Sequence, residues 1–224
     1  MKFRYLLIIP CCLLIIAIKI SGSWGLADVE RQKARTFIEQ WENDFESFRE
    51  EDWNKVVSHA KAAVDKDPDN PDLLFLMGNV YEWNAFHPEN QYKNNQQRQL
   101  ALEYYRKAVE LRPQWPYTWS GIALLKFRMN EFDQEFYLAL RNAMELGPWE
   151  PRVQSIIAEV GLNVWDKLKH TERLPIVENI RRGVVMQPQV MLDILNKYGQ
   201  LRMVCHEKNK QSIVEKYCEK NFGS

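Results

Sequence analysis

Cysteine and histidine are the side chains of this chain that could most readily bind a metal or react. Cys205, His206 and Cys218 could supply three ligands to a zinc ion, whereas a structural zinc site takes four. The sequence offers no fourth ligand at a suitable spacing and contains no His-Glu-x-x-His motif. We therefore expect no metal site, and we favour a disulfide between Cys205 and Cys218, which an exported protein could form. Such a bond would join the last helix to the one before it.

Carboxylates are numerous, but their spacing does not indicate catalysis. Asp65, Asp67 and Asp69 alternate around Pro68, yet they lack the glycine and the distal glutamate of a calcium-binding loop. The sequence has no Gly-x-Ser-x-Gly, Gly-x4-Gly-Lys-Ser/Thr or Gly-x-Gly-x-x-Gly motif. We expect a protein that is not an enzyme, with no catalytic residue and no cofactor.

Tryptophan is of interest because its large flat ring can stack on a sugar or anchor a protein partner. Trp115 and Trp149 lie beside prolines in expected turns, and Trp83 lies at the edge of an expected loop. These three are the candidate binding residues. The alternative is that their rings cover the ends of helical hairpins. Four other tryptophans occupy apolar helical positions and are expected in the core: Trp41, Trp53, Trp119 and Trp165.

The elements that would position these residues recur along the chain. Pro-x-x-Pro occurs at 68–71, 113–116 and 148–151, with spacings of 45 and 35 residues. The first proline of each motif ends a helix, because it lacks an N–H group and its ring clashes with the preceding turn. The second suits the first turn of the next helix. The three motifs therefore predict a series of helical hairpins.

The residues between these turns match the tetratricopeptide pattern, in which small residues let helices approach and large ones fill the gaps. The first complete match comprises Leu74, Met77, Gly78, Tyr81, Ala101, Tyr105, Ala108 and Pro113. The second comprises Trp119, Ile122, Ala123, Phe136, Leu140, Ala143 and Pro148, with Phe136 where a small residue is usual. One hairpin cannot bury its apolar face alone, so neighbours must stack. We predict an all-α fold, a tetratricopeptide-like α-solenoid of helical hairpins preceded by one N-terminal hydrophobic helix.

Helical periodicity gives the expected boundaries. Residues 28–48 should form a helix with one apolar face, made of Ala34, Phe37, Ile38, Trp41, Phe45 and Phe48. Further helices are expected at 52–66, 71–84, 98–111, 116–129, 132–146, 151–167, 173–186, from Pro188 to about Val204, and 209–221. An Asn/Gln-rich insertion at residues 85–99 interrupts the second hairpin. It is either a solvated loop or a lid that faces a partner.

The N-terminal segment differs from the rest of the chain. The apolar run from Tyr5 to Ile18 would form about 21 Å of helix, which suits the core of a signal peptide. If Lys19 reaches the headgroups, the run extends to Leu26 and about 33 Å, enough to cross a bilayer. We favour an uncleaved anchor over a signal peptide cleaved near Ser23 or Ala27. Residues 1–27 are thus expected as an anchor or signal segment and residues 28–224 as the helical repeat domain.

The charged residues predict the orientation of the chain in the membrane and exclude one class of partner. Lys2 and Arg4 favour a cytoplasmic N-terminus, so we expect a single pass through the inner membrane at residues 5–26 and a body in the periplasm. Cleavage would instead release the body into the periplasm. The chain has 30 Lys+Arg and 30 Asp+Glu, which argues against a nucleic-acid partner, because phosphate binding needs a basic face.

Two groups of residues resemble a known family. The segments 112–119 (Arg-Pro-Gln-Trp-Pro-Tyr-Thr-Trp) and 146–154 (Leu-Gly-Pro-Trp-Glu-Pro-Arg-Val-Gln) are similar to the VpsP-type polysaccharide biosynthesis proteins. The same resemblance extends to residues 77–83, Gly161, Leu162, Trp165, Tyr198, Val204 and Cys205. It implies a bacterial, envelope-associated accessory protein of exopolysaccharide synthesis or export, with no catalytic residues to carry over. Its partners would be envelope proteins of that complex, and the alternative is that it binds the glycan itself.

Overall fold

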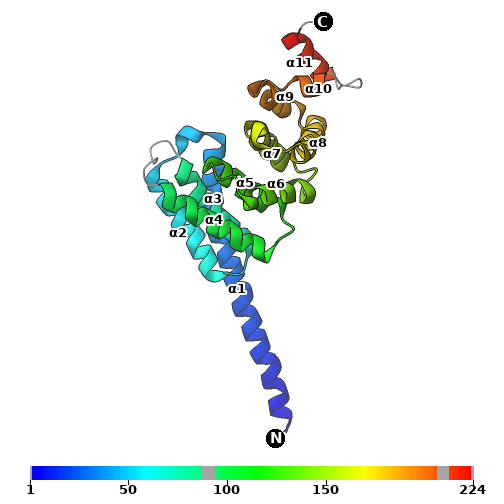
Figure 1. Ribbon diagram of the computed structural model, residues 1–224. Helices are drawn as coiled ribbons and strands as arrows, with labels where there is room; N and C mark the ends of the chain where they lie inside the picture. Colours follow the sequence, from blue (N-terminus) through cyan, green and yellow to red (C-terminus); the bar gives the residue numbers. More distant parts are fainter. Residues whose placement is uncertain (1, 87–93, 206–211, 223–224) are drawn as a thin grey trace. The chain divides into compact units, whose positions relative to one another are not determined.

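The computed structural model is all-α (Figure 1). It describes residues 2–86, 94–205 and 212–222, and no strand occurs in these ranges. The helices form antiparallel hairpins of the tetratricopeptide type after an N-terminal apolar helix, which confirms the predicted fold class. Contacts divide the chain into two compact units, Met1–Arg112 and Pro113–Ser224, and each is described by itself.

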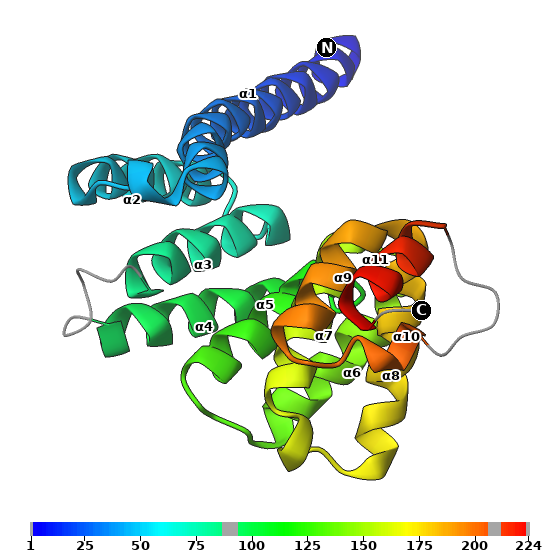
Figure 2. The ribbon, with the colours of Figure 1, turned by 90° about the horizontal axis from the view of Figure 1, so that it is seen from above.

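The first unit contains two hairpins. Helix α1 (Lys2–Asn43) pairs with α2 (Glu50–Lys66), and the short 3₁₀ helix η1 (Phe45–Ser47) joins them. Helix α3 (Pro71–Phe86) pairs with α4 (Asn94–Leu111) and also packs on α2. The view in Figure 2 shows these helices side by side, with the N-terminal part of α1 extending beyond them.

Helix α1 is longer than predicted at one end and shorter at the other. It runs from Lys2 to Asn43 without a break, whereas a separate helix was expected from residue 28. It ends five residues before the predicted limit, because the side chain of Asp44 caps η1 by accepting a hydrogen bond from the N–H of Glu46. Phe45 is consequently 49 % exposed and does not share the apolar face of α1.

The core of the first unit lies between α1, α2 and α3. Trp41, Val56, Ala60 and Met77 are buried there, and the indole N–H of Trp53 donates to the carbonyl of Val80 (2.9 Å). In the second hairpin Gly78 faces the ring of Tyr105 so closely that a Cβ at Gly78 would overlap that ring. The small residue of the tetratricopeptide pattern is therefore required by the close approach of α3 and α4.

Part of the predicted insertion is helical. Helix α4 begins at Asn94, so residues 94–97 belong to it, although they were expected in a loop. Glutamine and arginine are good helix formers, and Gln97 and Arg98 are half-buried, which favours extending the helix. The centre of the insertion, residues 87–93, lies outside the described residues.

The second unit continues the series of hairpins. Helix α5 (Pro116–Arg128) pairs with α6 (Gln134–Leu146), and α7 (Pro151–Asn163) pairs with α8 (His170–Met186) after the 3₁₀ helix η3 (Trp165–Lys167). Helices α9 (Pro188–Lys197), α10 (Arg202–Cys205) and α11 (Ser212–Phe222) follow. Pro116, Pro151 and Pro188 each occupy the first turn of their helix, as the Pro-x-x-Pro pattern predicts for the first two.

Two predicted helices are divided in the structure. The helix expected at 151–167 ends at Asn163 and is followed by the separate η3. The helix from Pro188 was expected to reach about Val204, but α9 ends at Lys197. Gly199 has a φ of +65°, a left-handed conformation that glycine adopts without strain and that ends a helix.

Helices α7 and α8 also meet at a small residue, because a Cβ on Gly161 would lie 2.8 Å from Ile176.

Candidate interaction surface

Two predicted binding residues lie in neighbouring turns of the second unit. Trp115 directly precedes Pro116 at the start of α5, and Trp149 lies in the turn between α6 and α7. Their side chains are 36 % and 57 % exposed. Because a proline fixes the first turn of each following helix, the backbone next to each tryptophan is held in a defined conformation.

These two turns contact each other. A Cβ on Gly147 would lie 2.6 Å from the Cβ of Pro116, so only glycine allows this approach. The hydroxyl of Tyr117 donates a hydrogen bond to a carboxylate oxygen of Glu150, and this bond raises the pKa of Tyr117. The structure therefore brings the segments that carry Trp115 and Trp149 side by side.

The exposed rings have charged and aromatic neighbours. The ring of Trp115 lies 5.3 Å from that of Tyr117, between centroids. The guanidinium of Arg182, on α8, lies 5.9 Å from the centroid of Trp149, within the range of a cation–π contact. We call Trp115, Tyr117, Trp149, Glu150 and Arg182 the aromatic edge. It offers flat apolar faces beside hydrogen-bonding groups.

Trp83 belongs to the other compact unit and is half-buried there. Its ring centroid lies 5.9 Å from that of Trp41 and 5.8 Å from that of Phe45. It packs against the core formed by α1, α2 and α3. The exposed area that made Trp83 a candidate is thus largely taken up by intramolecular contacts.

The four tryptophans expected in the core differ in burial. Trp41 and Trp53 are buried, at 1 % and 9 % exposure. Trp119 and Trp165 are only half-buried. The indole N–H of Trp119 donates to the carbonyl of Pro113 (2.7 Å), and the guanidinium of Arg173 lies 5.2 Å from the Trp165 ring centroid.

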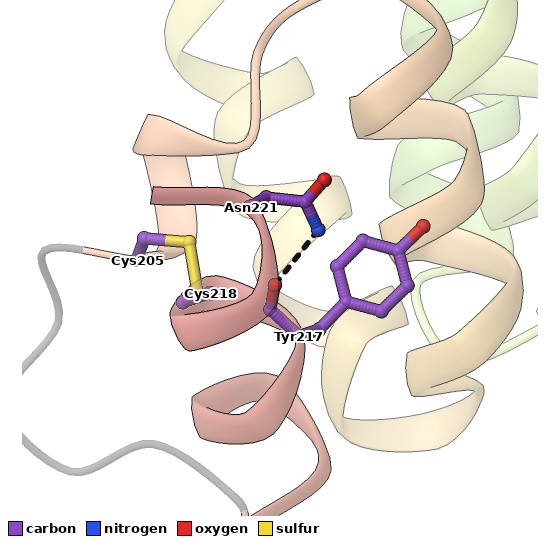
Figure 3. The surroundings of a disulfide bond; sticks show 4 residues. All are labelled: Cys205, Tyr217, Cys218 and Asn221. Atoms are coloured by element: carbon purple, nitrogen blue, oxygen red, sulfur yellow. Dashed lines mark hydrogen bonds between the residues drawn. A yellow bond between two sulfur atoms is a disulfide. The ribbon is translucent and has the colours of Figure 1, made fainter. Parts of the chain in front are cut away.

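Cys205 and Cys218 are joined by a disulfide of 2.02 Å, which links α10 to α11 (Figure 3). These thiols are therefore not free to bind zinc in this structure. His206 and His87 lie outside the described residues, and no group of metal-binding side chains occurs in the described part of the chain. The other two cysteines of the sequence, Cys11 and Cys12, are free thiols exposed on α1.

Lys126 is a buried cation that was not predicted from the sequence. The Lys126 side chain is only 2 % exposed, and its Nζ lies 3.3, 2.8 and 2.9 Å from Glu131, Asp133 and Glu135. Burial alone would lower the pKa of Lys126, but the hydrogen bonds to Asp133 and Glu135 outweigh burial and raise it. These ion pairs of Lys126 stabilise the turn between α5 and α6. Their only sequence signal is a lysine in an apolar helix followed by closely spaced carboxylates.

Comparison with known proteins does not identify a family for this chain. No family model matches the chain, and no curated protein matches it either. Among solved structures, the crystal structure of the MamA protein is similar over 91 % of this chain and 90 % of MamA, with a TM-score of 0.49 and 15 % identity. A similarity of this extent indicates nothing about what the chain binds.

The geometry fits recognition of a ligand or partner. The aromatic edge combines exposed rings with one carboxylate and one guanidinium, but it holds no nucleophile activated by a neighbouring base. Stacking on an apolar face and hydrogen bonding at its rim are what this set of side chains can do.

Proposed function

We propose that the chain is a non-enzymatic, membrane-tethered scaffold that assists bacterial exopolysaccharide biosynthesis or export. The helical hairpins support a role in protein interaction, and the resemblance of residues 112–119 and 146–154 to the VpsP-type proteins supports the polysaccharide context. Its partners are envelope proteins of the synthesis or export complex. The tether raises the effective concentration of the scaffold near such partners.

The observation that supports a membrane tether is that α1 continues without a break from the apolar segment into the folded body. Every described side chain from Ile9 to Gly22 is exposed, and the helix is long and apolar enough to cross a membrane, although a signal sequence meets the same criterion. Within the same helix Ser23 donates a hydrogen bond to the carbonyl of Lys66 (2.8 Å), and Ala27 is buried against Ala63 and Leu73.

This continuity favours an anchor over a cleaved signal. Cleavage after Ala27 would remove a buried residue from the first unit and expose Ala63 and Leu73. Cleavage after Ser23 would remove the hydrogen bond to Lys66. We therefore propose an uncleaved anchor, and the basic residues Lys2 and Arg4 support a single pass through the inner membrane with the body in the periplasm. The alternative location is the periplasm after signal cleavage.

Two measurements test this function. A phosphatase active only in the periplasm, fused after residue 30, should be active, and an inactive fusion would contradict the exported topology. Affinity purification of the full chain from solubilised membranes should recover polysaccharide synthesis or export proteins. The purification is repeated with Trp149→Ala, which removes an exposed ring of the aromatic edge, and with the control Leu174→Ala, at an exposed position eight residues before Arg182 on α8.

The alternative function is glycan binding by the exposed tryptophans. The specific observation in its favour is that Trp115 and Trp149 lie on adjacent turns beside Glu150 and Arg182, whose polar groups could bind sugar hydroxyls. Trp83, the third residue of this hypothesis, would contribute from its half-buried position in the first unit.

Titration of the full chain with the cell's own exopolysaccharide, followed by tryptophan fluorescence, tests the alternative. Saturable quenching that is lost in Trp115→Ala and Trp149→Ala, but retained in Leu174→Ala, would favour glycan binding. No quenching together with co-purified envelope proteins would favour the scaffold.

A further inference from the structure

A pocket of about 480 Å³ lies in the first unit, where α1 passes the turn between α2 and α3. It is distinct from the aromatic edge, since all of its lining residues belong to the first unit. One side comes from α1 and the other from the turn and the start of α3. The lining residues are Trp24, Ala27, Asp28, Arg31, Asp67, Asn70, Asp72 and Leu73.

One carboxylate of this pocket, that of Asp67, has no cationic partner among the described residues. Asp28 accepts from the Nε of Arg31 (2.9 Å), and Asp72 accepts from the Nη1 of Arg112 (2.8 Å). Asp67 accepts only from the neutral amide of Asn70 (2.8 Å), and no cation pairs with it among the described residues. The carbonyls at the C-terminal end of α2 add partial negative charge beside it. The pocket therefore favours a ligand with a positive group near Asp67.

The same pocket also offers donors for a negative group. The guanidinium of Arg31 carries five N–H donors, and Asp28 uses its Nε and Nη2. The Arg31 side chain is 34 % exposed, and its Nη1 donates to no group in the described part of the chain. An ammonium at Asp67 and a phosphate at Arg31 can thus occupy one pocket.

The position of the pocket along α1 indicates where such a ligand comes from. The hydrogen bond from Ser23 to Lys66 means that the folded body begins at residue 23. The 18 residues from 5 to 22 span about 27 Å of helix, close to the roughly 30 Å of a bilayer core. Trp24 follows immediately, is 56 % exposed, and is the residue type enriched at membrane interfaces. This places the pocket at the level of the lipid headgroups, an inference that rests on the proposed membrane tether.

We propose that this pocket binds the headgroup of a zwitterionic phospholipid with a primary ammonium, as in phosphatidylethanolamine. The ammonium donates hydrogen bonds to Asp67, and the phosphate accepts them from Arg31. A choline headgroup has no N–H to donate, and one tryptophan does not form the aromatic cage that binds a quaternary ammonium. An anionic glycerol headgroup would place no cation beside Asp67.

Native mass spectrometry of the full chain in mild detergent tests this assignment. The chain is offered equal amounts of phosphatidylethanolamine, phosphatidylcholine and phosphatidylglycerol with identical acyl chains. We expect phosphatidylethanolamine to be retained roughly tenfold better than phosphatidylcholine, the effect of about one charged hydrogen bond. Equal retention, or preference for either other lipid, would overturn the proposal.

Two variants locate the binding site. Asp67→Asn should abolish the preference, because it removes the one carboxylate of the pocket without a cationic partner. Asp69→Asn removes the same charge two residues away, at an exposed position that does not line the pocket, and should keep the preference. Equal preference in both variants would overturn the assignment to this pocket. The wild-type lipid preference tests the proposal even if Asp67→Asn does not fold.

Two further experiments are needed. One distinguishes a lipid ligand from a soluble one, and the other tests the membrane tether independently. Soluble glycerophosphoethanolamine should not compete with the lipid at equal concentration; if it does, the pocket takes a soluble phosphoamine and the lipid assignment fails. Flotation of the full chain with phosphatidylcholine vesicles tests the tether independently. A chain that floats but shows no lipid preference keeps the proposed function and overturns this inference, whereas a chain that does not float overturns both.

Discussion

Ser23 on α1 donates a hydrogen bond to the main-chain carbonyl of Lys66, 43 residues further along the chain at the end of α2. This contact joins the apolar helix to the folded body only one residue after the exposed stretch that ends at Gly22. The carbonyl of Lys66 lies in the last turn of α2, where no intrahelical N–H is available to it. The bond therefore satisfies a helix end and fixes where the body begins relative to the apolar segment.

The close approach of α3 and α4 predicts that alanine destabilises the chain at Gly78 but not at Gly22. Gly78→Ala should lower the free energy of unfolding by about 1–3 kcal/mol, because the new methyl group overlaps the ring of Tyr105. That ring cannot easily move, since its hydroxyl donates to Glu82 (2.6 Å). Urea unfolding of the full chain, followed by circular dichroism, measures the loss.

Gly22→Ala is the control for this prediction. A Cβ at Gly22 meets no atom within 4 Å, so the substitution should not destabilise the chain, and alanine is the better helix former. If both substitutions changed the free energy of unfolding equally, the inference that α3 and α4 pack tightly at Gly78 would be wrong.

The buried Lys126 predicts how stability responds to acid. Partial burial would raise the pKa of Asp133, but hydrogen bonds from Lys126 and from the backbone N–H of Phe136 outweigh it and lower that pKa from 3.8. A lowered folded-state pKa stabilises the native chain above the unfolded value, and this contribution is lost as the pH falls through the folded value. Wild type should therefore lose more stability than Asp133→Asn when the pH is lowered from 7 to about 3.

Urea midpoints of the two proteins at pH 7, 4 and 3 measure this difference. Asp133→Asn should already be less stable at pH 7, because asparagine can still cap α6 but cannot pair its charge with the buried Lys126. Parallel loss of stability in both proteins across this range would show that Asp133 contributes nothing through its charge.

The disulfide predicts which helix depends on redox conditions. Cys205 and Cys218 close a loop with a sequence separation of 13, and a link of this size is worth about 3 kcal/mol by the chain-entropy estimate. The buried residues of α11 are only Val214 and the bonded Cys218, so few apolar contacts hold this helix without the link.

Reduction, or the double substitution Cys205→Ala with Cys218→Ala, should therefore unprotect the backbone amides of α11. Hydrogen exchange read by mass spectrometry measures this, with α7 as an internal control that should stay protected. Unchanged protection of residues 212–222 after complete reduction would mean that packing alone holds α11.

The repeat pattern predicts the fold well because its signals are local. Pro116 and Pro151 begin helices in the structure as expected, and Gly78 packs against Tyr105 at the predicted small position. Boundaries that depend on other contacts were harder to predict. The end of α1 depends on the cap formed by Asp44, and the split between α9 and α10 on the left-handed conformation of Gly199.

The candidate site was partly predictable for the same reason. The exposure of Trp115 and Trp149 follows from their places beside prolines, but the contact between their turns depends on Tyr117 meeting Glu150, 33 residues away. The half-burial of Trp83 depends on Trp41, from another hairpin. The charged environment of Lys126 requires the turn after α5, in which Asn130 has a φ of 58°. The contacts of Tyr117 and Trp83 join distant residues and leave no short-range sequence signal, whereas the partners of Lys126 are close in sequence and depend on the geometry of the turn.

The central claim is that α1 stays intact and holds the body at the membrane. The most direct test is the intact mass of the native chain recovered from washed membranes. We predict a mass no smaller than 26.6 kDa, the mass of residues 1–224, apart from processing of the initial methionine. A soluble product that begins between residues 22 and 28 would contradict the claim, because the buried end of α1 would then have been cut from the segment that crosses the bilayer.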